Sequence, residues 1–236
     1  AILAKNIYGC ETEMDTIKFG QMSLQLMTKQ LCDNVHKCNS LSENPFIKAE
    51  KRFDAIVTNP PFGTRMKYPE LKKTFEELFP NSPVKFKTVY PIKTNNGACL
   101  FVQHCVHMLK DNGVCAIVLP DGELFDSHSK WSATFRKWWC EQVNIRTILK
   151  VPAGVFKHAG VRTSVVVFTK DGETQTIQYQ EVVDKTCTSI RELFRVPIED
   201  VIKAKYSLDY KTYMPDEGDV YDVPMVPLGE VCEFHN

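Results

Sequence analysis

The stretch from Phe53 to Gly63 constrains this chain more than any other. An apolar run at residues 55–57 predicts a short strand of the kind that a parallel sheet buries on both faces. Pro60 and Pro61 lack the backbone N–H that a sheet ladder needs, so the strand must end there. In an open α/β sheet such an end lies at the carboxyl edge, where ligands bind. The alternative is a plain turn that leaves a core strand.

The groups at this tip suit one kind of chemistry. The exocyclic amine of a nucleobase is a weak nucleophile, because its lone pair is delocalised into the ring. Two acceptors, the side-chain oxygen of Asn59 and the carbonyl of Pro60, can hold the amine hydrogens and aim the lone pair at a sulfonium methyl donor. Phe62 offers a stacking face for a base extruded from a duplex. Alignment and electrostatics then supply the rate, and no strong base is needed.

The remaining pattern alternates strands with helices, which favours an α/β fold with a mostly parallel sheet. A hairpin of 163–169 with 174–182 is expected to add an antiparallel edge. Glu11, at the end of the first strand, is placed like the acid that binds ribose hydroxyls, or it is a solvated acid that opens a helix. Further strands are expected at 6–11, 35–41, 114–120 and 144–151, and helices at 15–31, 69–78, 98–110 and 129–142.

Charge is unevenly distributed although the net charge is zero. Residues 1–170 hold 23 basic and 15 acidic residues, and residues 171–236 hold 6 basic and 14 acidic residues. A basic half fits a polyanionic partner, and a solvated mixed surface is the alternative. Residues 64–96 read as a long loop that interleaves aromatic and basic side chains. The candidate nucleic-acid contacts are Arg65, Lys67, Lys85, Lys87 and Arg162, the last of which could equally belong to a structural turn.

The nine cysteines include no Cys-x-x-Cys pair, which predicts reduced thiols and a cytoplasmic location. The sequence has no apolar run long enough to span a bilayer and no signal segment at its beginning, so we expect no membrane contact. His104 and His107 lie three residues apart near Cys99 and Cys105. Because no second pair has metal-ligand spacing, no metal site is expected.

Motifs in a fixed order resemble the modification subunit of type I restriction–modification systems. The tetrapeptide Asn59–Phe62 matches the catalytic motif of adenine-specific DNA methyltransferases, and residues 8–11 resemble the segment that holds the cofactor's ribose. The resemblance covers about residues 5–170, and an ordered series of motifs is far more specific than one tetrapeptide. The other matching segments are 101–104, 109–113, 118–125, 135–138 and 152–164.

The resemblance implies methyl transfer from S-adenosyl-L-methionine to the exocyclic amine of adenine in double-stranded DNA. It assigns catalysis to the tip, including Pro61, and cofactor binding to Glu11 and Asn39. It also implies a Rossmann-like methyltransferase sheet. The implied partners are a specificity subunit, or a fused target-recognition domain, and a restriction subunit.

The resemblance also suggests a division of the chain. Residues 1–185 are expected to be the catalytic region, and 186–236 a linker with the start of a C-terminal module. Residues 206–210 resemble the segment that closes the family's catalytic region. Residues 226–232 resemble the opening of a type I target-recognition domain.

Two departures from the family pattern stand out. The glycine-rich cofactor loop, on the strand that lies between the Glu11 strand and the Asn59 strand in the family, is absent. We therefore expect a sheet that is incomplete at its N-terminus and an isolated chain that is inactive. The second departure is Asn39, where the family usually has an acid near the cofactor's adenine; the amide oxygen can still accept from the adenine amine.

Two other functions remain open at this point. The same tip could serve methylation of RNA or of a protein glutamine. The missing strand instead favours a non-catalytic fragment that keeps a surface for DNA or for a partner subunit.

Overall fold

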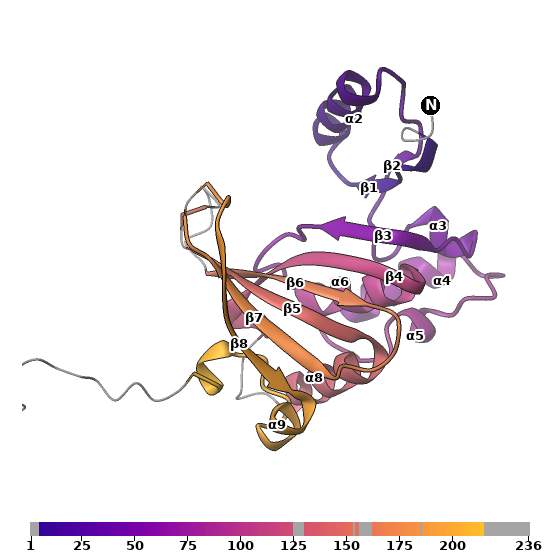
Figure 1. Ribbon diagram of the computed structural model, residues 1–236. Coiled ribbons are helices and arrows are strands. Elements are labelled where there is room, and N and C mark those ends of the chain that lie inside the picture. The colour runs from indigo at the N-terminus through magenta and orange to yellow at the C-terminus, as the bar shows by residue number, and fades with distance from the viewer. Residues whose placement is uncertain (1–4, 125–129, 153, 156–161, 185, 215–236) are drawn as a thin grey trace, which may run out of the picture.

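The computed structural model of this protein describes residues 5–124, 130–152, 154–155, 162–184 and 186–214 (Figure 1). A six-stranded mixed sheet forms its larger part, and a two-stranded sheet lies beyond one edge of it. Strands and helices alternate along most of the chain, so the predicted α/β fold class is confirmed.

The six-stranded sheet runs in the order β3-β4-β6-β5-β7-β8. β3 is parallel to β4, β6 is antiparallel to both of its neighbours, and β5 is parallel to β7. The strands are β3 (Phe53–Thr58), β4 (Leu109–Pro120), β5 (Asn144–Val151), β6 (Thr163–Thr169), β7 (Thr176–Val182) and β8 (Ile190–Pro197).

The hairpin predicted between residues 163–169 and 174–182 is wrong. β6 lies between β4 and β5 and has no free edge, and β7 pairs along the other edge of β5. β6 ends opposite Asn144, the first residue of β5, because Thr169 pairs with it. The chain therefore crosses the start of β5 and reaches its other edge, where β7 begins. The expected antiparallel edge exists, but β7 forms it with β8.

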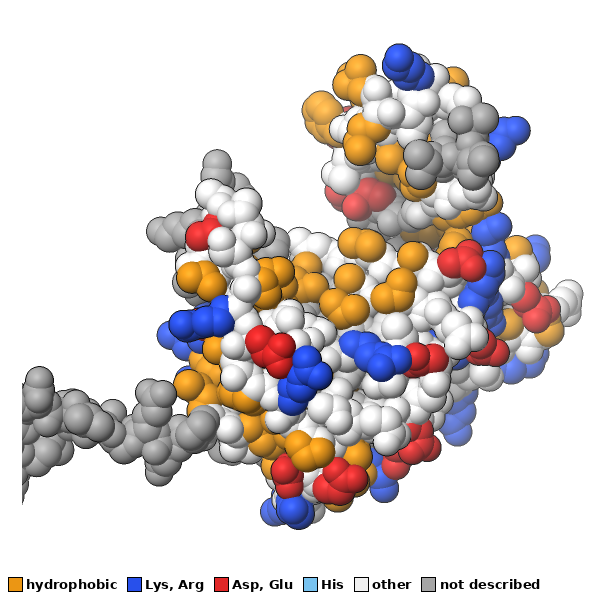
Figure 2. Space-filling model, viewed as in Figure 1, with side chains coloured by type: hydrophobic (Ala, Val, Ile, Leu, Met, Phe, Trp, Pro, Cys, Tyr) orange, Lys and Arg blue, Asp and Glu red, His pale blue; other side chains and the backbone are white. Residues whose placement is uncertain are grey.

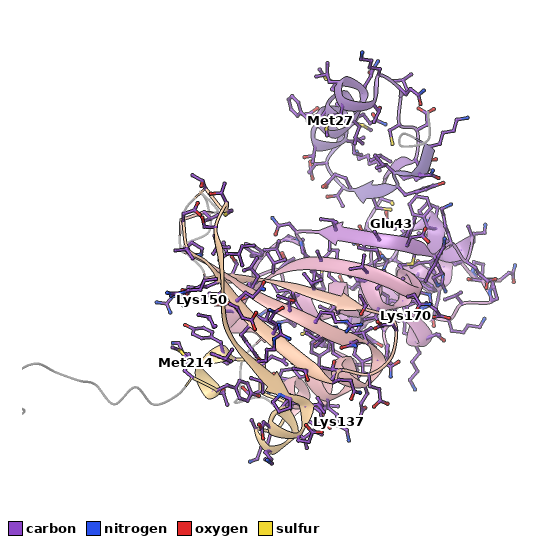
Figure 3. All side chains as sticks on the ribbon, in the orientation of Figure 1. Met27, Glu43, Lys137, Lys150, Lys170 and Met214 are labelled. Atoms are coloured by element: carbon purple, nitrogen blue, oxygen red, sulfur yellow. The ribbon has the colours of Figure 1, made fainter. Side chains whose placement is uncertain are left out.

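The N-terminal unit pairs β1 (Gly9–Glu11) with β2 (Val35–Lys37) in parallel, and α2 (Met14–Thr28) connects them. The apolar stripe predicted on this helix is present, but it is not a buried face. Ile17 is buried, whereas Phe19 is 69% exposed. Met27, which is labelled in Figure 3, is 82% exposed. Two short strands offer α2 too narrow a surface to cover such a stripe.

One face of the large sheet carries α6 (Gly97–Met108) and α8 (Lys130–Gln142), and no described helix lies over the other face (Figure 1). In β4, Ile117 is fully buried while Val114 is 39% exposed. The prediction that residues 55–57 are buried on both faces is therefore wrong: Val57 is 86% exposed. Apolar side chains gather on the open face near β3 (Figure 2).

Residues 64–96 are built into the core through their aromatic side chains. Tyr68, Phe75, Phe86 and Tyr90 are buried in a second apolar cluster, which also includes residues of α6. These four rings pack in the protein interior and are not exposed as stacking surfaces. The short helices here are α4 (Tyr68–Leu78) and α5 (Phe86–Val89), and α3 (Pro45–Lys48) contributes to the same cluster.

The helix predicted at 98–110 is confirmed as α6, and Asn96 caps it by accepting a hydrogen bond from the backbone N–H of Cys99 at 3.0 Å. Residues 111–113, which follow this helix, form an irregular turn inside β4. Asn112 has a positive φ of 62°, and the β3–β4 register shifts between Phe53 and Ala55. The turn residues thus bend a strand that continues on both sides of them.

The chain after residue 185 continues to pack on the sheet up to the last described residues. β8 pairs with β7, and Val201 of α9 (Ile198–Lys203) and Leu208 lie in the main core. The division at residue 185 stays a prediction. The segments 156–161 and 226–232, part of the expected family motifs, lie outside the described residues.

A buried polar network ties α6 to the turn after β2. The Tyr90 hydroxyl donates to the carbonyl of Leu41 at 2.7 Å, so it accepts from Nδ1–H of His104 at 3.0 Å. Nε2 of His104 then accepts from the side-chain amide of Asn44 at 3.2 Å. Asn44 in turn caps α3 by accepting from the N–H of Phe46. Each polar group has a partner, as a buried network requires.

Two further observations concern membrane-spanning helices and metal-ligand clusters. Within the described residues, no helix is long and apolar enough to cross a membrane. In the same part of the chain no three His, Cys, Asp or Glu side chains come close enough to hold a metal ion. The eight cysteines that the structure describes are free thiols.

Gly97→Ala should lower the free energy of unfolding by about 1–3 kcal/mol, because overpacking of this kind forces the backbone to shift. An added Cβ would lie 2.7 Å from the carbonyl oxygen of Thr64. The control is Gly20→Ala in α2, where an added Cβ meets nothing within 4 Å and a gain of about 0.5–1 kcal/mol is expected. Urea unfolding measures both; a Gly97→Ala protein as stable as the wild type would contradict the close approach.

Acid should destabilise the fold through His104. Burial, and to a lesser extent the charge of His107, lowers the pKa of His104 from 6.5 to about 3. The stabilisation from the neutral ring is therefore complete above pH 6.5 and is lost as the pH falls toward 3, by about 1.4 kcal/mol per pH unit for one group. Urea unfolding at several pH values should give His104→Gln a lower stability at pH 7 and a shallower acid slope. Parallel slopes for the two proteins would rule this role out.

Candidate active site

The tip after β3 lies at the carboxyl edge of the sheet, as predicted. Thr58 pairs in parallel with Ile117 near the end of β4, and Asn59 follows directly. Asn59 is exposed, and in the described part of the chain its side-chain amide has no hydrogen-bond partner. Pro60 is buried and Pro61 is exposed, so one proline anchors the tip. The backbone beside Asn59 is therefore anchored, while the Asn59 amide is left uncommitted among the described residues.

The chain leaves the tip along a fixed path. Phe62 is half-buried, and Gly63 turns the backbone with a φ of +65°. The following residues are then bonded to the segment before α6. The N–H of Gly97 donates to the carbonyl of Thr64 at 3.1 Å, and the N–H of Met66 donates to the carbonyl of Asn95 at 2.8 Å.

Glu11 and Asn39 come from the neighbouring ends of β1 and β2. The N–H of Cys38 donates to the carbonyl of Glu11 at 2.9 Å, which brings the two strand ends together. Oε1 of Glu11 accepts from the N–H groups of Thr12 at 2.6 Å and Glu13 at 3.1 Å. Oε2 has no partner among the residues that the structure describes. One carboxylate oxygen thus fixes the side chain and the other remains available.

Asn39 is held by its own turn. Its Oδ1 accepts from the N–H of Leu41 at 3.0 Å, and its backbone N–H donates to Oε2 of Glu43 at 3.1 Å. Glu43, labelled in Figure 3, was not among the predicted site residues. Its spacing of four residues from Asn39 in a turn-rich segment is the signal that could have indicated it.

A cavity of about 460 Å³ lies between the strand that ends at Glu11 and the strand that leads to the tip. It lies between β1 and β3: Gly9 and Cys10 line one wall, and residues 55–58 line the other. Among the described strands, β1 pairs only with β2 and β3 only with β4. The structure therefore joins Glu11 to Asn39, and Asn59 to the rest of the tip, but it does not bring the two groups into contact.

Asp121 adds an acid to the same edge of the sheet. It opens α7 (Asp121–Leu124) directly after β4 and accepts from Oγ of Ser164 at 2.7 Å. Burial raises the pKa of this carboxyl above its usual value. Its N–H donates to the carbonyl of Arg162 at 3.0 Å, which places Arg162 at the tip's end of the sheet.

The predicted nucleic-acid contacts fall into two groups. Arg65 and Lys67 are exposed beside the tip and line a second cavity. Lys85 and Lys87 are also exposed, but they belong to α5 and its N-cap and are not in the lining of that cavity. Lys93 does line it and was not among the predicted contacts. Its basic character was visible in the sequence, but its proximity to Arg65 depends on the fold.

A model of the family N-6 DNA Methylase matches residues 1–192 of this chain. The methylase subunit of the type I restriction enzyme EcoEI from Escherichia coli is 30% identical over 180 residues, which are 76% of this chain and 33% of that relative. The EcoKI methylase subunit of Escherichia coli strain K12 is 32% identical over 163 residues, which are 69% of this chain and 24% of the relative. The chain thus spans about a third or less of these two relatives.

Solved structures show the same fold. The methyltransferase subunit of a type I restriction–modification system from Streptococcus thermophilus has a TM-score of 0.65 at 21% identity, over 85% of this chain and 47% of that one. A chain from a type I system whose complex assembly was studied has a TM-score of 0.71 at 24% identity, over 98% and 51%. The fold is that of class I S-adenosylmethionine-dependent methyltransferases. Because the family match covers most of its length, this chain belongs to the N-6 DNA methylase family.

Proposed function

We propose that this chain carries the target-base half of a DNA methyltransferase that acts on the exocyclic amine of adenine in a type I restriction–modification system. The observation that carries the proposal is the exposed, uncommitted amide of Asn59 on a tip anchored by a buried proline. Membership of the N-6 DNA methylase family supports the same substrate.

The chemistry follows from two acceptors. Oδ1 of Asn59 and the carbonyl oxygen of Pro60 each accept one hydrogen of the adenine amine, which moves the nitrogen toward a tetrahedral geometry. The lone pair is then directed out of the ring plane toward the methyl group. Phe62 stacks on the extruded base and fixes its plane. S-adenosyl-L-methionine, when bound, would supply the methyl group: the C–N bond forms as the S–CH₃ bond breaks, a neutral thioether leaves, and the amine nitrogen releases one proton.

Part of the described site fits that cofactor. Oε2 of Glu11 is free to accept from ribose hydroxyls, and the Asn39 side chain lies at the adjacent strand end for the adenine. The residues around the cavity between β1 and β3 do not include a glycine-rich strand–helix turn. We infer that one further strand occupies this cavity and supplies that turn, because it would pair with the open edges of both β1 and β3.

The wider assembly is part of the proposal. The named relatives are methylase subunits of type I restriction enzymes, which supports double-stranded DNA as the substrate and specificity and restriction subunits as partners. A fused target-recognition domain is the alternative to a separate specificity subunit. We propose that residues 1–185 form the catalytic region and that residues 186–236 connect it to a C-terminal module.

The competing functions differ in their support. The family match favours DNA over RNA or protein glutamine as the substrate. The open cavity beside the tip favours inactivity of these 236 residues when they are separated from the further strand. The methylation alternatives thus differ in the substrate, whereas the non-catalytic alternative depends on whether the cofactor side is complete.

Asn59→Ala in the full-length protein should lower methyl transfer to DNA at least about a hundredfold, the usual cost of removing one preorganised hydrogen-bonding group. Transfer of labelled methyl from S-adenosyl-L-methionine to duplex DNA measures this. Asn81→Ala, at another exposed asparagine, is the matched control and should keep full activity. Unchanged methylation in Asn59→Ala would sink the assignment of the tip.

Glu11→Gln should weaken S-adenosyl-L-methionine binding about tenfold, because hydrogen bonds to a charged group are worth about 1.5–3 kcal/mol. Calorimetric titration of the full-length protein measures the dissociation constant. Glu13→Gln, two residues away and exposed, is the control and should bind normally. Equal affinities for the two variants would exclude Glu11 from the cofactor site. The 236 residues alone should bind more weakly than the full-length protein, since they lack the glycine-rich turn.

A further inference from the structure

A second cavity, of about 700 Å³, lies immediately beyond the Asn59–Phe62 tip; we call it the loop cavity. Residues 63–67 form one wall, and residues 93–96 form the other. Gly122, just after β4, completes the lining. The cavity therefore begins at the residue that follows Phe62 and shares the carboxyl edge of the sheet with the tip.

The two walls of the loop cavity are fixed to each other by main-chain hydrogen bonds. Besides the bonds of Met66 and Gly97 described above, the N–H of Tyr68 donates to Oδ1 of Asn95 at 3.1 Å. Gly97 is the residue that allows the walls to meet, because any side chain there would strike Thr64. The cavity is thus held by the fold itself and is not a gap between two independent loops.

The loop cavity presents hydrogen-bond donors and positive charge. Arg65 and Lys93 are exposed, and within the described residues neither has a carboxylate partner. Lys67 is paired with Glu70, with 2.9 Å between Nζ and Oε1. None of the lining residues that the structure describes is acidic.

Two side-chain amides add neutral donors. Oδ1 of Asn95 accepts from Tyr68, and Oδ1 of Asn96 accepts from Cys99, so the oxygens are committed. Their NH₂ groups donate to nothing in the part of the chain that the structure describes. Oriented NH₂ donors beside uncompensated cations form an environment that favours an oxyanion over any cationic or apolar ligand.

We propose that the loop cavity binds a backbone phosphodiester of the substrate DNA strand next to the extruded adenine, with Arg65 and Lys93 as its charged contacts. The proposal rests on the proposed function, because the tip must hold the base for the neighbouring phosphate to reach this cavity. Phosphate contacts set the register of a strand and carry no base information. Arg65 and Lys93 are accordingly positioning residues for the target nucleotide, and Lys85 and Lys87 lie outside this contact.

The test compares Arg65→Gln/Lys93→Gln with Lys72→Gln/Lys73→Gln in the full-length protein. The control removes the same charge from the exposed side of α4, where both lysines pair with glutamates of that helix. Binding of a fluorescent duplex, measured by anisotropy over a range of salt concentrations, should lose about 0.9 of salt slope for each phosphate contact removed. The first double variant should also bind DNA about tenfold more weakly at moderate salt, since charge-assisted bonds are lost.

Methyl transfer supplies the second readout. The Arg65/Lys93 variant should show a raised KM for DNA with an unchanged dissociation constant for S-adenosyl-L-methionine, and the control should resemble the wild type. If the wild type methylates DNA and both double variants lose the same affinity and salt slope, the phosphate site is wrong and the proposed function stands. If the wild type does not methylate DNA with cofactor bound, the proposed function itself fails.

Discussion

The one-sided pairing of β3 is the constraint on which the rest of the site depends. β4 supplies every main-chain partner that the described structure gives β3, and the parallel register carries Asn59 to the carboxyl edge beside Asp121. An edge strand with free N–H and C=O groups and an exposed Val57 is an open template for another strand. The same pairing that positions the Asn59 tip therefore leaves the other edge of β3 open.

The local parts of the site could be predicted from the sequence because single residues determine them. Two prolines must end β3, and Asn96 before an apolar periodic segment must cap α6. Glu11 and Asn39 were each placed at the end of a strand, and the parallel pairing of β1 with β2 brings them together. The carboxyl ends of paired parallel strands lie at the same edge of a sheet, so the two strand ends meet.

The errors concern features that depend on distant parts of the chain. The residues of β6 and β7 suit a hairpin locally, but β4 and β5 occupy both edges of β6. Residues 64–96 read as a long loop with interleaved aromatic side chains, yet α6 provides a surface that buries four of those rings. The stripe of α2 has a helical period, and its exposure depends on how wide the neighbouring sheet is. Periodicity identifies an apolar face but not what lies against it.

Helix α6 links the two sides of the site. Its first residues hold the loop after the tip through the Thr64–Gly97 contact, and His104 holds the turn that follows Asn39 through Tyr90 and Asn44. His104 lies seven residue steps after Gly97 along the helix, a rise of about 10 Å. A rigid helix of this length keeps the wall of the loop cavity and the turn after Asn39 at a fixed separation, although no described strand joins β1 to β3. The relative positions of these two parts are therefore set by α6 and do not depend on main-chain pairing between β1 and β3.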